Sequence, residues 1–148
     1  MSDSGLPTST SLPPPVHELH VVAAIVRHDD RVLAARRLPG GPAGLKWEFP
    51  GGKVESDESP RSALIREIEE ELGLTVDVGP ELGVFVSPLG QRAIRLQCYL
   101  CTVDNPNVQL RAHSEVMWCS IRELALLDWA APDVPAVERL TTAWDDIW

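Results

Sequence analysis

The 148-residue sequence contains no apolar run near the roughly 18–20 residues of a membrane-spanning helix, and no hydrophobic region typical of a signal peptide. It is also poor in cysteine, with only Cys98, Cys101 and Cys119. An odd number of cysteines provides no disulfide framework and is typical of a reducing compartment. We therefore expect a cytoplasmic protein that has no membrane partner.

The C-x-x-C spacing of Cys98 and Cys101 lies in an apolar run that alternates like a strand. Residues i and i+3 of a strand point to opposite faces. We therefore predict two packing cysteines rather than a metal or redox pair.

Basic residues are scarce: 13 Lys and Arg stand against 22 Asp and Glu, which gives a formal net charge of −9. Proteins that bind nucleic acid polymers rely on clustered Lys and Arg, so such a partner is not expected. A protein this acidic needs metal ions or a local cationic pocket to bind phosphates. The oligomeric state cannot be inferred from the sequence.

The length suits one domain. Residues 1–18 are rich in Ser, Thr and Pro and are predicted to form a disordered leader, so that a single domain occupies residues 19–148. Apolar patterning predicts strands over 19–27, 31–37, 74–78, 81–87 and 93–103, with further short strands at 108–110 and 116–119. Helices are expected over 121–127, capped by Ser120, and over 136–148.

The most informative stretch is an acidic helix that follows a glycine turn. Ser59 and Pro60 form a typical helix start and Gly73 a typical stop. Leu64, Ile65, Ile68 and Leu72 are predicted to form the packed stripe, with three glutamates, Glu67, Glu70 and Glu71, on an adjacent face. Arg66 can pair with Glu70 at (i, i+4), which leaves Glu67 and Glu71 uncompensated. A solvated acidic face is one interpretation, and a site for a hard divalent cation is the other.

The spacing favours the second interpretation. Nine positions match the Nudix hydrolase signature without a gap, within a run of 23 residues: Gly52, Glu58, Arg66, Glu67, Ile68, Glu70, Glu71, Gly73 and Leu74. The chain resembles the MutT-like branch of that family more loosely from His20 to Leu140. This resemblance implies an α/β fold, the Nudix fold, in which a mixed β-sheet is sandwiched between helices.

The resemblance also implies Mg²⁺-dependent hydrolysis of a nucleoside triphosphate to the monophosphate and pyrophosphate, with Mn²⁺ as a possible substitute. The glutamates of the helix and the carbonyl of Gly51 would hold the metal ions. Glu67 is a candidate base, and Lys53 would contact phosphates unless it is an ordinary surface lysine. Arg66 would orient the acids, and Glu58 would brace the loop or complete an outer metal shell.

Three further residues correspond to substrate-binding positions of MutT-like enzymes. Arg37 would lie over the base, Asp133 would read its edge, and Trp129 would shape the pocket. Surface exposure is the alternative for Arg37, helix capping for Asp133 and core packing for Trp129. Relatives often carry an acid six residues before the tryptophan found here as Trp118, where this chain has Ala112. We expect Glu115 as a possible additional base, with His113 as another substitute.

The resemblance leaves the substrate open. Sanitation of the nucleotide pool by cleavage of 8-oxo-dGTP, a form of DNA repair, is the first hypothesis. Cleavage of CTP, dCTP or 5-methyl-dCTP is the alternative, because an ionised Asp133 only accepts hydrogen bonds and cytosine offers an amine. Hydrolysis of ADP-ribose is less favoured. A Nudix-fold module that binds nucleotides without cleaving them belongs to a different class and is disfavoured by the intact glutamates.

Overall fold

The computed structural model describes residues 17–148. Residues 1–16 of the predicted leader therefore lie outside the described residues. His17 and Glu18, which were assigned to the leader, form the start of the first described strand, β2 (His17–His28). Within the described range, no helix combines the length and the apolar character needed to cross a membrane.

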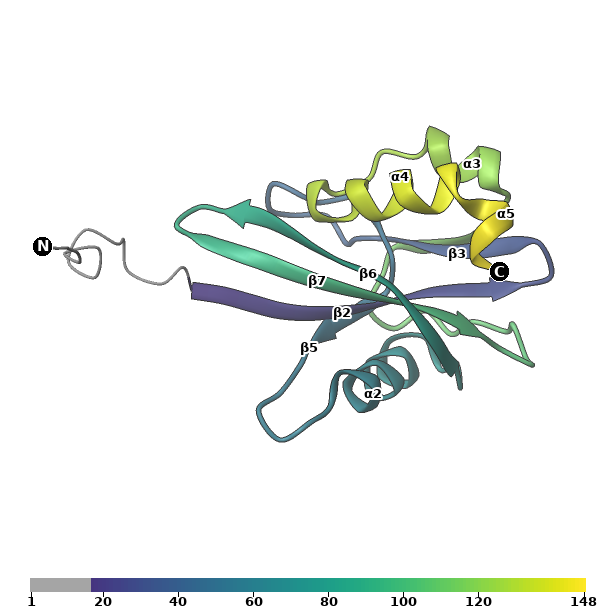
Figure 1. Ribbon diagram of the computed structural model, residues 1–148, viewed down its shortest axis with the longest axis horizontal. Helices are drawn as coiled ribbons and strands as arrows, with labels where there is room; N and C mark the ends of the chain where they lie inside the picture. Colours follow the sequence, from purple (N-terminus) through teal and green to yellow (C-terminus); the bar gives the residue numbers. More distant parts are fainter. Residues whose placement is uncertain (1–16) are drawn as a thin grey trace, which may run out of the picture.

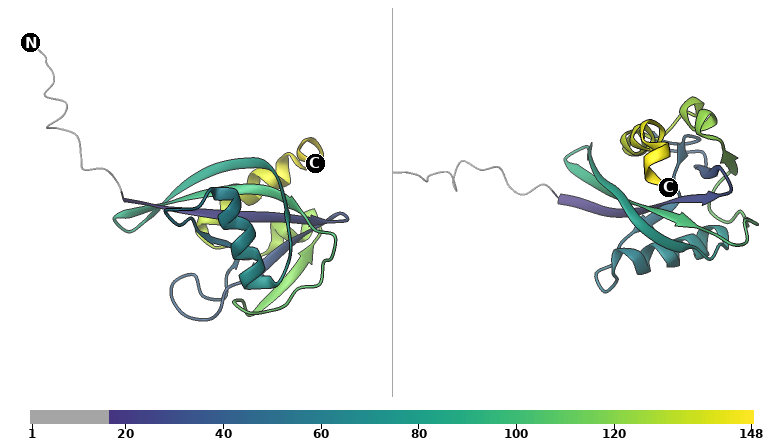
Figure 2. Two further views of the ribbon diagram at one scale, coloured as in Figure 1. Left: turned by 90° about the horizontal axis from the view of Figure 1, so that it is seen from below. Right: turned by 45° about the vertical axis from the view of Figure 1, so that its right-hand side comes forward.

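The fold is a mixed seven-stranded sheet covered by helices on both faces, as predicted (Figure 1). Its other strands are β3 (Arg31–Arg36), β4 (Trp47–Glu48), β5 (Gly51–Lys53), β6 (Asp77–Leu89), β7 (Arg92–Thr102) and β8 (Glu115–Cys119). The helices are α2 (Pro60–Leu72), α3 (Ile121–Leu126), α4 (Val134–Thr142) and α5 (Trp144–Ile147), with a 3₁₀ turn, η1, over Ala131–Asp133. Figure 2 shows α2 alone on one face of the sheet and the C-terminal helices on the other.

Strand β2 is the centre of the sheet. It pairs in parallel with β7 along eleven residue positions, and antiparallel with both β3 and β5. Residues 22–26 of β2 are fully buried because the strand has helices above and below it. This explains why β2 appears in the sequence as a continuous apolar run rather than an alternating one.

Alternate residues of the strands supply two separate cores. Cys98 belongs to the core beneath α3 and α4, whereas Cys101 belongs to the core beneath α2. Both thiols are free and buried, and burial raises the pKa of Cys101 to about 12. The prediction of packing cysteines on opposite faces is therefore confirmed.

The strands predicted over 74–78 and 81–87 are one strand, β6, which begins only at Asp77. Three further local predictions were wrong. Ile65 is 45% exposed, because the buried stripe of α2 consists of Ala63, Leu64, Ile68 and Leu72 and leaves Ile65 at its margin. Residues 108–110 form no strand. There the backbone N–H of Gln109 donates to the carbonyl of Leu72 at 2.8 Å, so the segment closes the end of α2 instead of extending the sheet.

The third concerns the last helix, which begins earlier than predicted and is interrupted. The helical conformation begins with the turn η1 and continues directly into α4. Pro135 lies in the first turn of α4, a position that suits proline. Ala143 then leaves the helical conformation between α4 and α5. The guanidinium carbon of Arg27 lies 5.2 Å from the ring centroid of Trp144 and 5.0 Å from that of Trp148, which holds α5 against the end of β2.

Candidate active site

The acidic face is fixed by the ends of α2. Ser59 caps the helix by accepting from the N–H of Ser62 at 3.1 Å. Gly73 ends it in the left-handed region, at φ +66°, where its N–H donates to the carbonyl of Glu69 at 3.0 Å. Both predicted caps are confirmed, and they determine which residues of α2 face the glycine loop.

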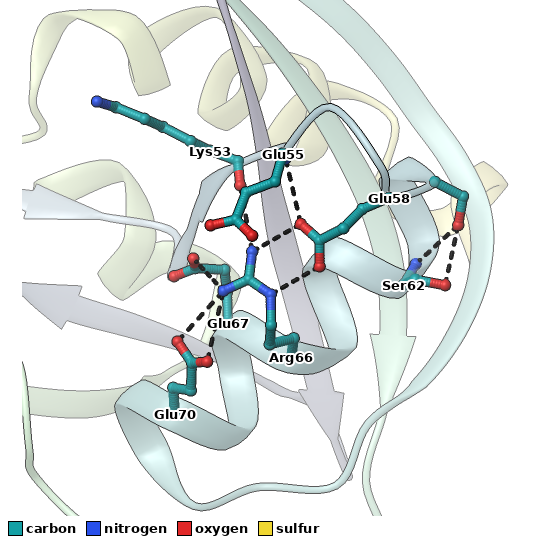
Figure 3. A network of polar contacts seen from close by, with 8 residues as sticks. Lys53, Glu55, Glu58, Ser62, Arg66, Glu67 and Glu70 are labelled. Atoms are coloured by element: carbon teal, nitrogen blue, oxygen red, sulfur yellow. Dashed lines mark hydrogen bonds and ion pairs between the residues drawn. The ribbon is translucent and has the colours of Figure 1, made fainter.

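Arg66 is the centre of the acidic network (Figure 3). It binds Glu58 in a two-pronged contact, with both N···O distances 2.7 Å. It also donates to Glu67 at 2.9 Å and to Glu70 at 3.3 Å. The prediction that Glu67 is left uncompensated was therefore wrong, because the Arg66 fork reaches more acids than its (i, i+4) partner.

Glu58 also ties its own loop. The N–H of Glu55 donates to Oε1 of Glu58 at 3.2 Å, so one carboxylate joins the turn before α2 to Arg66 within the helix. Hydrogen bonds from Arg66 hold the pKa of Glu58 below its usual value despite some desolvation.

Glu71 differs from its neighbours because Arg66 does not reach it. Its Oε1 is buried and has no hydrogen-bond partner among residues 17–148. Burial raises the pKa of the Glu71 carboxyl far above its usual range, and the nearby carboxylates of Glu67 and Glu48 raise it further. A buried carboxylate beside two others is a group that a cation would stabilise.

The glycine loop lies directly against these acids. A Cβ on Gly52 would overlap the Glu67 carboxylate, and one on Gly51 would overlap the carbonyl of Val22. Glycine is thus required at position 51, where the overlap is with backbone, whereas a side chain at position 52 would force the Glu67 carboxylate to move.

A cavity of about 620 Å³ opens beside the glycine loop. Four of the predicted site residues lie on its wall: Arg37, Gly51, Lys53 and Asp133. Figure 3 shows the Lys53 side chain pointing away from the Arg66 network. Apolar residues complete the wall, including Leu19, Val21, Phe49, Ile94 and Leu96.

Asp133 is the buried acid of this cavity, with 5% of its surface exposed. Its Oδ2 accepts from the backbone N–H of Phe49 at 2.9 Å. Burial raises the pKa of Asp133 to about 7, and the Glu48 charge acts in the same direction, whereas the Phe49 N–H and Arg37 oppose it. Asp133 makes no side-chain capping bond to α4, so the capping alternative is not supported.

Two predicted residues lie elsewhere. Trp129 is buried in the core, where its indole N–H donates to the carbonyl of Leu124 at 2.7 Å and its ring packs on Phe49. It supports the cavity wall only through Phe49. Glu115 lies on the same face of β8 as Met117 and Cys119, which pack in the core beneath α3 and α4, and it pairs with Arg36 at 2.8 Å. This position on the face opposite α2 does not favour a role for Glu115 as a base at the acids of α2, and that role stays a prediction.

Glu48 is a residue of the site that the sequence patterns did not reveal. This carboxylate faces the α2 side of the sheet, close enough to influence both Glu71 and Asp133, and it lines the cavity. The sequence signal for this role is the position of Glu48 between Trp47 and Phe49, just before the glycines. Trp47 and Phe49 pack in the other core, so alternation directs Glu48 to the opposite face.

Residues 17–140 match the family model of the NUDIX domain. The chain belongs to the NUDIX domain family. It is 39% identical to the CTP pyrophosphohydrolase of Escherichia coli (strain K12) over 121 residues, which cover 81% of this chain and 89% of that protein. It is 37% identical to the 8-oxo-dGTP diphosphatase of Proteus vulgaris over 87 residues, covering 57% and 77%.

Solved structures agree with this assignment. The E. coli ORF135 protein superposes with a TM-score of 0.77 at 34% identity, covering 87% of this chain and 92% of that one. The MutT protein of Methanosarcina mazei Go1 gives 0.78 at 26% identity, covering 88% and 97%. The chain is therefore a Nudix hydrolase of MutT-like type.

Nudix hydrolases generally use divalent metal ions. Within residues 17–148 no three His, Cys, Asp or Glu groups already converge as a complete metal site, since Glu67 and Glu70 turn toward Arg66. The unpaired Oε1 of Glu71 beside Glu67 nevertheless fits a hard cation, which prefers oxygen ligands. Binding would require Glu67 and Glu70 to be shared between Arg66 and the ion.

Proposed function

We propose that this Nudix hydrolase is a Mg²⁺-dependent nucleoside triphosphate pyrophosphohydrolase. The observation that carries the proposal is the buried, unpaired Oε1 of Glu71 beside Glu67, at a glycine loop that also lines a nucleotide-sized cavity. The glycines connect the acids to the cavity, because Gly51 and Gly52 line it and Gly52 packs on Glu67.

Glu67, Glu70, Glu71 and the Gly51 carbonyl would hold Mg²⁺, with Mn²⁺ as a substitute. The ion would supply charge neutralisation at the phosphate oxygens and lower the pKa of the attacking water. Lys53 reaches into the cavity as a point charge for the phosphates. Arg66 and Glu58 hold the acids in place without touching substrate.

In the proposed reaction, the water oxygen forms a bond to the inner of the two phosphorus atoms that leave. The bridging P–O bond between that phosphorus and the phosphate of the nucleotide breaks, and pyrophosphate departs with the added oxygen. Glu67 accepts the proton of the attacking water, and the monophosphate is the second product.

The nucleobase of the substrate would contact the part of the cavity formed by Asp133, Phe49 and Arg37. Since Oδ2 of Asp133 is taken by the Phe49 N–H, Oδ1 is the oxygen available to the base. An ionised Oδ1 accepts a hydrogen bond. The N7–H of 8-oxoguanine provides a donor that guanine lacks, which supports 8-oxo-dGTP as substrate and a role in nucleotide pool sanitation.

Cytosine triphosphates are the second candidate. The cytosine amine is a donor that an ionised Asp133 can accept, and uracil has a carbonyl at that position. The similarity to the E. coli CTP pyrophosphohydrolase favours this candidate as well.

Two matched pairs of nucleotides test both substrates. We expect pyrophosphate release with Mg²⁺ to show a kcat/KM at least about 100-fold higher for 8-oxo-dGTP than for dGTP, which corresponds to about 2.7 kcal/mol. A comparable ratio for dCTP over dUTP, with CTP and 5-methyl-dCTP also cleaved, would assign the enzyme to cytosine nucleotides instead. Turnover of ADP-ribose alone, or binding of nucleotides without turnover, would contradict the proposal.

A further inference from the structure

Three side chains form a continuous hydrogen-bonded series from the interior to the cavity. Arg37 donates from Nη1 to Oε1 of Glu48 at 2.8 Å. The second oxygen of Glu48, Oε2, lies 2.9 Å from Nε2 of His113. Glu48 thus joins a histidine from the loop before β8 to the arginine that lines the cavity.

Exposure decreases steadily along the series. The side chains of Arg37, Glu48 and His113 are 45%, 21% and 3% exposed. Burial alone would favour the neutral acid, yet hydrogen bonds from His113 and Arg37 outweigh it and hold the pKa of Glu48 below its usual value. Because an ionised carboxylate only accepts, Nε2 of His113 is the donor.

The loop that carries His113 is hydrogen-bonded to the backbone of Arg36 and Arg37 at the end of β3. The backbone N–H of Ser114 donates to the carbonyl of Arg36 at 2.9 Å, and its hydroxyl lies 3.3 Å from the carbonyls of Arg36 and Arg37. His113 is therefore fixed relative to the end of β3 by the main chain as well as by burial.

Arg37 itself is half-exposed. It lines both the large cavity and a second cavity of about 260 Å³. Ala112, where relatives often carry an acid, borders this second cavity and supplies no partner for the guanidinium. The orientation of Arg37 consequently depends on Glu48.

We propose that His113 is a positioning residue that acts through Glu48 to hold the Arg37 guanidinium against the bound nucleotide base. This inference rests on the proposed function. His113 touches neither the acids of α2 nor the substrate, so its loss should weaken binding of the base and leave the chemistry at the phosphates intact.

A double-mutant cycle tests the coupling. We expect His113→Leu to lower kcat/KM for the preferred nucleotide about tenfold, mostly through KM, with kcat within about twofold. His113→Gln, which retains a donor, should recover most of the loss. In an Arg37→Ala background, His113→Leu should have no further effect on KM.

A matched control is His28→Leu, which removes a histidine close to a carboxylate, Asp29, at the turn between β2 and β3. It should leave KM unchanged. The inference would be overturned if His113→Leu raised KM equally with and without Arg37, or if His113→Gln recovered nothing. In either case an active wild-type enzyme would still support the proposed function. A wild-type chain that cleaves no nucleoside triphosphate would overturn both.

Discussion

Among single residues, Glu71 is the acid that the fold accommodates least well without a cation, because its raised pKa means that it must take up a proton on folding at neutral pH. Gln needs no proton and also gives Glu67 a donor nearby. We expect Glu71→Gln to raise the free energy of unfolding in EDTA by about 1 kcal/mol and to lower turnover with Mg²⁺ at least about 100-fold.

Glu69→Gln is the matched control, because Glu69 is an exposed glutamate of the same helix. It should change neither the free energy of unfolding in EDTA nor the turnover with Mg²⁺. Full turnover in Glu71→Gln would contradict its assignment as a metal ligand.

Asp133 makes stability depend on pH. Its folded pKa of about 7 lies above the value of roughly 3.9 in an unfolded chain, so the folded state binds the proton more tightly. The contribution of this proton to the free energy of unfolding is fully present below about pH 4 and is lost as pH rises through 7. Its full size is on the order of 3–4 kcal/mol.

The measurement is chemical denaturation of the wild type and Asp133→Asn between pH 5 and 8. Asparagine can still accept from the Phe49 N–H but does not titrate. The wild-type unfolding free energy should therefore fall relative to the variant as pH rises, and parallel profiles would contradict the assignment.

At the scale of elements, β5 approaches α2 most closely at Gly52, where a Cβ would overlap the Glu67 carboxylate. A methyl group there would displace the Glu67 carboxylate from Arg66. We expect Gly52→Ala to fold and to lose at least about tenfold in kcat.

Gly90→Ala, in the turn between β6 and β7, is the control for backbone strain. Gly90 has φ +60° and open space around its Cα, so alanine should cost about 1 kcal/mol of stability without affecting kcat. Equal kcat losses in the two variants would show that general destabilisation, and not the position of Glu67, causes the effect.

The elements also show how far the sequence predicts the structure. The limits of α2 follow from Ser59, Pro60 and Gly73, whose preferences are local. The capping box of Ser120 and Glu123 is likewise present as predicted. By contrast, the path of residues 108–110 depends on the carbonyl of Leu72, a distant partner that no local pattern reveals.

The same distinction applies to the site. The resemblance to MutT-like enzymes predicted Arg37 and Asp133 as substrate-binding residues, and both line the cavity. The relation between Glu48 and His113 spans 65 positions and appears only once β4 and the loop before β8 are brought together. Strand alternation predicts that Glu115 shares a face with Met117 and Cys119. Which side of the sheet that face covers is known only from the pairing of β8 with β3.

For the whole molecule, metal binding should appear as stability. A ligand that binds only the folded state stabilises it by about 1.4 kcal/mol at ten times its dissociation constant. We expect Mg²⁺ to raise the melting temperature of the wild type and not that of Glu71→Gln. The comparison is made against NaCl at equal ionic strength, because screening of a net charge of −9 also stabilises the fold. An equal rise in both proteins would contradict metal binding at Glu71.

The parallel pairing of β2 with β7 has a consequence for biosynthesis. Eleven residues of β2 each pair with a residue 75 positions further along, from His17 with Arg92 to Arg27 with Thr102. The ribosome must therefore synthesise the chain as far as Thr102 before β2 can complete its pairing with β7, and contacts of such long sequence separation slow folding. Until then the most apolar segment of the nascent chain has an unpaired edge, which is the kind of surface that chaperones protect.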